Sequence, residues 1–400
     1  MNSSNAQSIA LRLHTLTVFR NVYSDPLFSD IVLLLESANN EQSEKLELFC
    51  SLASSTYHCG GNLSKCILKL ALEDDNICTK FYASGKTPPE NLLICLEEEL
   101  KLLEEVASLT SNELKELTDF NGFLPDWQTT AYDFVDMFKE RMSNIRKYGS
   151  GIFVNNFAFR LINGTLAPVS HPDTISIEQL SGYERERSLI ENNTLALLDG
   201  KPAANVLLYG ESGTGKSSTV KALINKYSSC GLRLIEARKN QLNEIPDLIE
   251  LLNGNPLKFI IFIDDLSFAK DDDSFAGLKA VLEGSVTAKS ANVSIYATSN
   301  RRHLVKESFR DREGDEIHLA DTIAEITSLS DRFGLVVTFE RPGKDLYIDI
   351  VCELAKQNKI DMEKDKLAEL SELYALRRGG RSPRVAKQFI DSLNCRNSRI

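Results

Sequence analysis

One short stretch constrains the fold of this 400-residue chain more than any other: an apolar strand that runs directly into a glycine-rich loop. The strand reads NVLLYG, and GESGTGKSS continues from its last residue over positions 210–218. The loop satisfies the pattern G-x-x-x-x-G-K-[ST], which joins a buried strand to a helix and binds phosphate groups. The chain is therefore predicted to contain an α/β domain built on a parallel sheet.

Each position of this loop has a task in holding a nucleoside triphosphate. Glycines let the backbone curl so that successive N–H groups point at the phosphates, and the helix that follows directs its positive end at them. Lys216 neutralises the β- and γ-phosphate oxygens, and the Ser217 hydroxyl is a ligand for Mg²⁺. ATP and Mg²⁺ are therefore the expected cofactors. The expected nucleotide contacts are Gly210, Glu211, Ser212, Gly213, Thr214, Gly215, Lys216, Ser217 and Ser218.

A second apolar strand, KFIIFID, ends in two adjacent carboxylates, Asp264 and Asp265. Asp264 is expected to hold Mg²⁺ directly or through water. Asp265 stands where most ATPases of this layout have Glu, and it is expected to polarise the attacking water; the alternative is a helix cap. One methylene fewer withdraws the carboxylate by roughly 1.5 Å. Because misplacement of that size can cost about 100-fold in rate, slow hydrolysis is expected.

Composition and pattern divide the chain into four predicted regions. Residues 1–148 form an acidic helical domain, since residues 1–150 hold 13 Lys and Arg against 22 Asp and Glu. Residues 149–204 form a hairpin and a linker. Residues 205–342 contain five apolar strands separated by helical connections, which predicts a five-stranded parallel sheet with helices on both faces. Residues 343–400 read as small helices.

Two local predictions concern single elements. Residues 90–117 carry apolar positions spaced by three and four after Pro88-Pro89, which predicts one long helix, packed in its own bundle or in an intermolecular coiled coil. Asn163-Gly164, flanked by alternating apolar and polar residues, predicts a β-hairpin.

Charge and composition narrow the functional class. The net charge of −11 disfavours a nucleic-acid partner, although residues 376–400 hold six Arg and one Lys against a single Asp and keep that alternative open. No apolar run reaches the about 18 residues of a membrane span, and the N-terminus lacks the pattern of a secretory signal. The eight cysteines include no C-x-x-C pair. Reduced thiols and a cytoplasmic location are expected.

Five blocks, in order, resemble an AAA+ ATPase: LLYGESGTGKSS, FIIFIDDLSF, IYATSNRRHL, SLSDRFGL and RSPRVAKQF. More narrowly, they resemble a bacterial group known as domain-of-unknown-function family 815. The resemblance covers roughly residues 175–393. It implies an AAA+ core followed by a helical lid over residues 343–400.

The resemblance also implies roles for single residues. Asn300 matches the sensor-1 position that holds the attacking water or the γ-phosphate, with an ordinary turn residue as the alternative. Arg332 matches the arginine finger that reaches the nucleotide of a neighbouring subunit, with a salt bridge inside the subunit as the alternative. Arg384 matches the sensor-2 arginine of the lid, and Arg381 is the other candidate. Leu180 to Tyr183, with Gly182 and Tyr183 as the chosen contacts, match the stretch that lines the adenine pocket, although hydrophobic packing would also explain them.

These observations predict an ATPase that hydrolyses ATP with Mg²⁺ to drive conformational work on an unknown macromolecular client. The alternatives are a nucleotide-dependent binding switch with little turnover and a nucleic-acid remodeller similar to a helicase loader. The arginine finger further implies self-association into a ring or spiral, with a hexamer as the expected size.

Overall fold

The computed structural model describes residues 1–266, 278, 282, 291–300 and 332–397, and in it the chain forms two compact units, Met1–Val154 and Asn155–Ile400. The finer division into four regions stays a prediction. Within the described part of the chain, no helix combines the length and the apolar character needed to cross a membrane.

Unit 1 is helical, and side-chain caps define several of its helix starts. Asn2, Asp25, Asn62, Asn76 and Asp133 each accept a hydrogen bond from a backbone N–H of the first turn that follows, which satisfies a donor that the helix leaves unpaired. The helices are α1 (Ser3–Leu13), α2 (Pro26–Glu36), α3 (Gln42–His58), α4 (Leu63–Glu73), α5 (Ile77–Ala83), α6 (Glu90–Ala107), α7 (Ser111–Lys115), α8 (Phe134–Ser143) and α9 (Ile145–Tyr148).

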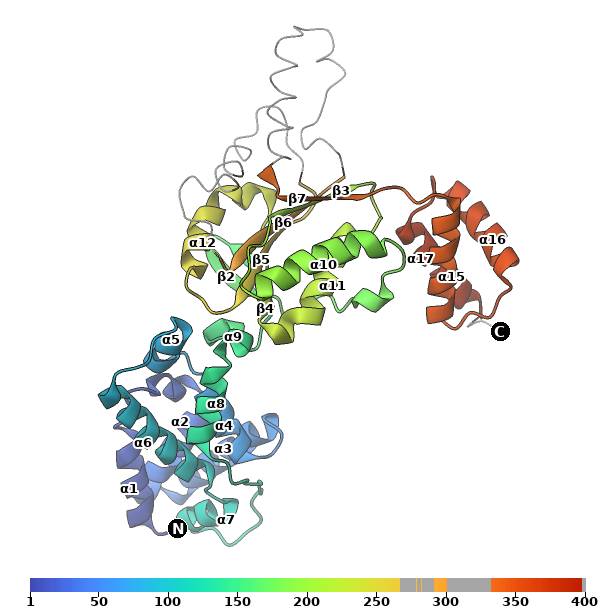
Figure 1. Ribbon diagram of the computed structural model, residues 1–400. Coiled ribbons are helices and arrows are strands. Elements are labelled where there is room, and N and C mark those ends of the chain that lie inside the picture. The colour runs from blue at the N-terminus through green and yellow to red at the C-terminus, as the bar shows by residue number, and fades with distance from the viewer. Residues whose placement is uncertain (267–277, 279–281, 283–290, 301–331, 398–400) are drawn as a thin grey trace. The chain divides into compact units, whose positions relative to one another are not determined.

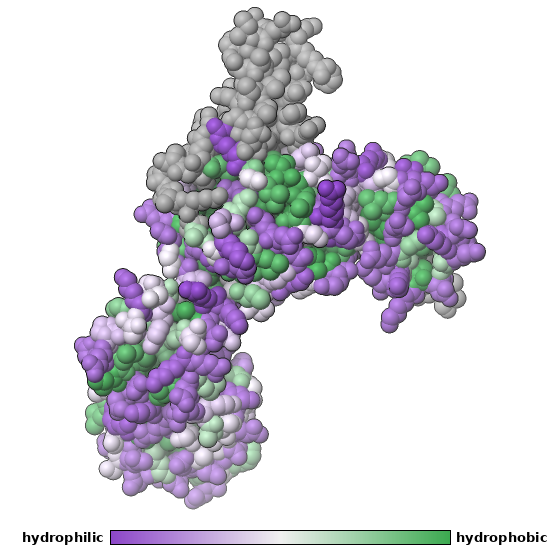
Figure 2. Space-filling model, viewed as in Figure 1, coloured by the Kyte–Doolittle hydropathy of each residue, from purple (hydrophilic) through white to green (hydrophobic). Residues whose placement is uncertain are grey.

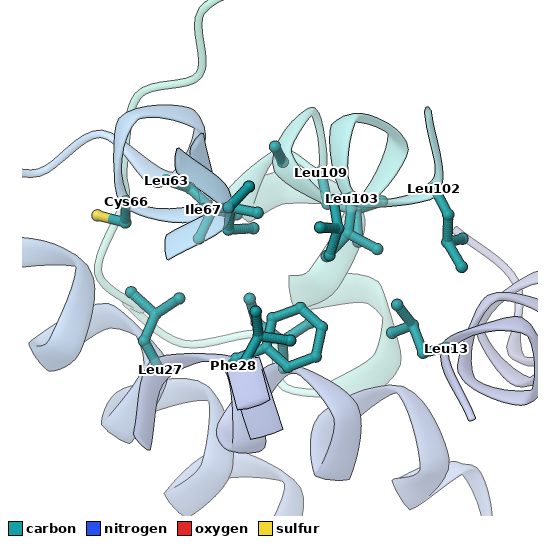
Figure 3. Close-up of a cluster of buried hydrophobic side chains, with 14 of the residues drawn as sticks. Leu13, Leu27, Phe28, Leu63, Cys66, Ile67, Leu102, Leu103 and Leu109 are labelled. Atoms are coloured by element: carbon teal, nitrogen blue, oxygen red, sulfur yellow. The ribbon is translucent and has the colours of Figure 1, made fainter. Parts of the chain in front are cut away.

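The apolar faces of these helices meet in one core. Figure 3 shows part of it, where Phe28 of α2 lies near Ile67 of α4 and Leu103 of α6. Burial of such side chains is worth about 1.5–3 kcal/mol each. The face of unit 1 that Figure 2 shows is mostly hydrophilic, as its acidic composition requires.

The prediction of one helix over residues 90–117 was wrong at its C-terminal end. The helix begins at Glu90 as expected but ends at Ala107, and a separate helix, α7, starts at Ser111. Thr110 causes the break, because it forms a capping box: its hydroxyl accepts from the Glu113 N–H, and the Glu113 carboxylate accepts from the Thr110 N–H. The stripe of α6 is buried in the core of unit 1, which accounts for the heptad spacing without an intermolecular coiled coil.

Unit 2 is an α/β domain followed by three helices (Figure 1). Its strands are β1 (Ala158–Ile162), β2 (Thr165–Pro168), β3 (Val206–Gly210), β4 (Leu232–Glu236), β5 (Lys258–Ile263), β6 (Val293–Ser299) and β7 (Leu335–Phe339). Its described long helices are α10 (Glu184–Leu198), α11 (Lys216–Tyr227), α12 (Ile245–Leu252), α15 (Lys344–Gln357), α16 (Lys364–Arg377) and α17 (Pro383–Asn397).

Within the described residues, the strands form one seven-stranded sheet in the order β2-β1-β4-β5-β6-β3-β7. The prediction of five strands was therefore low by two. The hairpin at Asn163-Gly164 is present, with positive φ at both turn residues, and its strand β1 pairs in parallel with β4 and so extends the sheet. The five predicted strands are parallel to one another, and among the strands that the structure describes only β1 and β2 pair antiparallel.

Hydrogen bonds fix α10 on the sheet, where it lies beside α11 on one face (Figure 1). Asn193 of α10 donates to the Ala204 carbonyl at 3.0 Å and to the hydroxyl of the fully buried Tyr296 of β6 at 3.1 Å. These contacts tie α10 to the strand that leads into the phosphate-binding loop and to the strand beside it.

The three C-terminal helices form a small bundle. Tyr347, Ile350 and Val351 of α15 are buried together with Phe389 and Ile390 of α17. The bundle follows β7 directly, because α15 begins five residues after β7 ends.

Candidate functional site

The glycine-rich loop leaves β3 and enters α11 as the sequence predicts. Gly210 has φ +142°, and a Cβ there would lie 2.0 Å from the carbonyl oxygen of Phe339 on the neighbouring strand β7, so the close packing of β3 on β7 requires glycine. Gly215 has φ +94° and is the residue before the first turn of α11. The loop thus presents the N-terminus of a 12-residue helix, where unpaired N–H groups favour an anion.

Lys216 lies at the centre of the site and is 6% exposed. Its Nζ donates to the carbonyl oxygens of Gly210 and Glu211 at 2.8 and 2.9 Å, and to Oδ1 of Asn300 at 3.1 Å. Burial lowers the pKa of Lys216, and the negative charges of Asp264 and Asp265 oppose that shift. A buried ammonium group held by neutral oxygens is ready to gain an anionic partner.

Asp264 lies beside the hydroxyl of Ser217, the second residue of α11. Ser217 Oγ donates to Asp264 Oδ1 at 2.6 Å, and Thr298 Oγ1 donates to the same oxygen at 2.5 Å. A carboxylate and a hydroxyl are the hard oxygen ligands that Mg²⁺ prefers. The donor set at this point therefore fits Mg²⁺.

Asp265 has a left-handed backbone with φ +54°. Its N–H donates to Thr298 Oγ1 at 2.9 Å, and its Oδ1 accepts from Asn300 Nδ2 at 2.7 Å. Most helix N-cap residues have extended backbones, so this conformation does not favour the capping alternative. Residues 267–277, which such a helix would have to include, lie outside the described part of the chain.

The C-terminal bundle contributes Arg384 to the site. Its backbone N–H donates to the Gly213 carbonyl at 3.1 Å, and its guanidinium lies 3.5 Å from Ser212 Oγ. Arg381 instead forms a two-pronged ion pair with Glu372, at 2.8 and 2.7 Å. The geometry therefore favours Arg384 over Arg381 as the arginine that faces a bound phosphate.

These groups line one cavity of about 860 Å³, a size typical of small-molecule sites. Its lining also includes the apolar side chains of Ile175, Leu180, Ile350 and Leu354. Ser181 Oγ is buried in the same wall without a hydrogen-bond partner among the described residues. Apolar side chains and an unpaired hydroxyl in the same lining as a loop suited to phosphate fit a nucleotide.

Gly182 and Tyr183 do not lie in the wall of this cavity. The Tyr183 ring packs 5.3 Å from that of Phe339, and its hydroxyl donates to the Glu340 carbonyl at 2.5 Å. A Cβ on Gly182 would be 2.8 Å from Ile350 Cδ1. Hydrophobic packing, the alternative left open from the sequence, accounts for both residues. The neighbours Leu180 and Ser181 are the ones that reach the cavity.

Arg332 lies half-buried two residues before Gly334, where the chain approaches β7. Residues 301–331, which hold most of the segment before it, lie outside the described part of the chain. Its assignment as an arginine finger stays a prediction.

Thr298 was not predicted from the sequence as a site residue. Ser181 belongs to the predicted stretch from Leu180 to Tyr183, although Gly182 and Tyr183 were the chosen contacts. Thr298 is 2% exposed and bonds to both Asp264 and Asp265. The signal was present in IYATSN, because a polar residue inside an apolar strand, two positions before Asn300, needs a hydrogen-bond partner in the sheet.

Comparisons with known proteins find similarity over part of the chain. The zinc import ATP-binding protein ZnuC of Vibrio parahaemolyticus serotype O3:K6 (strain RIMD 2210633) is 29% identical over 90 residues, which cover 22% of this chain and 33% of that protein. The chain therefore spans about a third of that relative. Among solved structures, the Thermotoga maritima RuvB Holliday junction branch migration motor is 16% identical with a TM-score of 0.36, over 54% of this chain and 63% of that one. A mutant form of the same RuvB is 17% identical, with the same TM-score and the same coverage of both chains.

A family profile matches more of the chain. The family described as "Protein of unknown function (DUF815)" covers residues 154–397, which is all but the last three residues of unit 2. The parallel sheet, the phosphate-binding loop after β3, the paired carboxylates after β5 and the helical bundle after β7 all lie within the matched residues. The chain belongs to the DUF815 family.

Proposed function

We propose that this chain is an ATPase that binds ATP with Mg²⁺ and hydrolyses it to drive a conformational change in a macromolecular client. The observation that supports this most is a continuous series of hydrogen bonds in one cavity: Lys216 donates to Asn300, and Asn300 donates to Asp265. These bonds hold three groups side by side: the Lys216 cation, which would bind phosphate, and the Asn300 amide and Asp265 carboxylate, which would act on water.

The residues divide the work by their chemistry. Lys216 and the loop N–H groups bind the phosphate oxygens, and Arg384 approaches from the C-terminal bundle. Asp265 orients the attacking water and accepts its proton, while Asn300 fixes the Asp265 carboxylate. Catalysis then consists mainly of positioning and of neutralising charge on the γ-phosphate.

Ser217 and Asp264 would hold Mg²⁺, which when bound neutralises charge on the phosphate oxygens. The apolar side chains of the lining, Ile175, Leu180, Ile350 and Leu354, would enclose the base. Because Ile350 and Leu354 belong to α15, bound nucleotide would hold the C-terminal bundle against the core, and that bundle would act as the lid.

Self-association follows from the proposed role of Arg332. An arginine finger completes the site of a neighbouring copy, and because the two contacting surfaces differ, the assembly closes into a ring or continues as a spiral. We propose a hexamer that acts in the cytoplasm on a protein client.

A binding switch without turnover is the second candidate. The left-handed Asp265, whose carboxylate is one methylene shorter than Glu, is the observation that favours it, since both features affect where the carboxylate reaches. Asp265 separates the two functions, because only an ATPase needs its charge.

The test compares Asp265→Asn with Lys216→Ala. An ATPase predicts that Asp265→Asn lowers phosphate release by about 100-fold or more, as removal of a general base does, while ATP affinity changes by less than about threefold. Lys216→Ala should lose affinity and serves as the background for release. Wild-type release no greater than that of Lys216→Ala, with ATP still bound, would leave the switch as the function.

A further inference from the structure

A single hydroxyl, that of Thr298, contacts both carboxylate residues of the site. Its Oγ1 donates to Asp264 Oδ1 at 2.5 Å and accepts from the Asp265 N–H at 2.9 Å. The Thr298 carbonyl accepts from the Leu266 N–H at 2.7 Å. Three consecutive residues after β5 are thus held by one residue of β6.

Burial makes these bonds selective for a hydroxyl. Thr298 is 2% exposed, so an unpaired donor there would lose its bonds to water without replacement. The hydroxyl has one proton, which goes to Asp264, and an acceptor lone pair, which receives the Asp265 N–H. Valine has the same shape and makes neither bond, whereas serine can make both.

Two donors converge on the same oxygen of Asp264, one from Ser217 and one from Thr298. If the Ser217 hydroxyl turns to a metal ion, it no longer donates to Asp264. Among the described residues, Thr298 is then the side chain that still donates to this carboxylate and orients it. On the other side, the bond to the Asp265 N–H supports a left-handed backbone that a non-glycine residue adopts at a cost.

We infer that Thr298 is a positioning residue, whose hydroxyl sets the Asp264 carboxylate for the metal and the Asp265 carboxylate for water. The inference rests on the proposed function. It explains how Asp265 can act where most ATPases of this layout have the longer Glu. The Asp265 side chain starts from a left-handed backbone with φ +54°, and the hydrogen bond to Thr298 stabilises that conformation.

Thr298→Val tests this inference, with Thr298→Ser as the conservative variant. Thr194→Val is the matched control, since Thr194 is also a fully buried threonine of unit 2, with bonds to the Ile190 carbonyl and the Tyr296 hydroxyl. Thr298→Val is expected to lower kcat by about 10- to 100-fold, the loss that misplacement by about 1 Å produces, with KM for ATP within about threefold. Thr298→Ser should keep kcat within about fivefold of wild type, because it retains both bonds.

A second readout does not depend on turnover. Binding of a non-hydrolysable ATP analogue is measured in Mg²⁺ and in EDTA. Thr298→Val should reduce the Mg²⁺-dependent gain in affinity by about 10-fold, the cost of one charge-assisted hydrogen bond, and leave the affinity in EDTA unchanged. Thr194→Val should change neither the Mg²⁺-dependent gain in affinity nor the affinity in EDTA. This should hold even if Thr194→Val lowers the thermal stability as much as Thr298→Val does.

The outcomes are distinct. Wild-type protein that binds the analogue without hydrolysing ATP would refute the proposed hydrolysis, and the Mg²⁺-dependent affinity would still decide the role of Thr298. Equal Mg²⁺-dependent affinity and kcat in Thr298→Val and wild type would overturn the inference. So would equal losses in Thr298→Val and Thr194→Val, because a purely structural role would then explain both.

Discussion

At the scale of single residues, the site is built around a lysine that the fold buries before any ligand arrives. Nζ of Lys216 is surrounded by the Gly210 and Glu211 carbonyls and the Asn300 amide oxygen. Burial nevertheless lowers its pKa below the ordinary 10.5, so the nucleotide-free protein holds this ammonium group at a cost in stability. A bound phosphate would supply the negative charge that this buried ammonium group lacks, and it would therefore offset the cost in stability.

This cost predicts a pH dependence. Between the lowered pKa of native Lys216 and 10.5, the unfolded chain binds a proton there that the native chain releases, so the free energy of unfolding rises with pH. Lys216→Met removes this contribution. The stability of nucleotide-free wild type relative to Lys216→Met should therefore increase as pH rises toward 10.5, measured by calorimetry on the transition of unit 2. A difference that stays constant or decreases would contradict the pKa shift.

The sequence predicts a site residue when the residue belongs to a local motif, and it fails when the position of the residue depends on contacts that are distant in the sequence. The loop at 210–218 and the carboxylates at 264 and 265 belong to strand ends whose geometry follows from the sequence nearby, and the structure brings them together. Thr298 acts through contacts across the sheet, so the strand IYATSN indicates that it needs a hydrogen-bond partner but not that the partners are Asp264 and Asp265. Tyr183 was expected in the cavity, but its ring has a better partner in Phe339, a residue 156 positions away.

At the scale of elements, single capping residues decide where helices end. Apolar spacing continues through residues 108–117, and periodicity alone therefore extends α6 too far. Thr110 and Glu113 offer the backbone a new helix start instead. The hairpin shows the same limit for sheets: Asn163-Gly164 predicts the turn, but the pairing of β1 with β4 depends on residues more than 70 positions apart.

The capping box yields a stability prediction for unit 1. Thr110→Ala should lower the free energy of unfolding by about 1 kcal/mol, because the Glu113 N–H loses its acceptor. Trp127, the one tryptophan of the chain, is buried in unit 1 and donates to the Leu109 carbonyl, so its fluorescence during urea unfolding reports on this unit. Glu113→Gln keeps an acceptor at the same position and should cost less. Equal stability of Thr110→Ala and wild type would show that the break has another cause.

At the scale of the whole molecule, the proposed function joins two parts of unit 2 through the nucleotide. The sheet supplies Lys216, Asp264 and Asp265, and the C-terminal bundle supplies Arg384 and the apolar residues of α15. Unit 1 has its own core and a surface whose sequence is acidic.

The most direct test of this account mixes two inactive variants. Lys216→Ala lacks the phosphate lysine but keeps Arg332, and Arg332→Ala lacks the finger but keeps the loop. If each site is completed by a neighbouring copy, a mixed assembly contains some sites with both residues. ATP hydrolysis in the mixture should then exceed the sum of the two separate preparations and be greatest near equal amounts. A mixture that never exceeds that sum, together with a monomeric Arg332→Ala protein that hydrolyses ATP at the wild-type rate, would contradict the account.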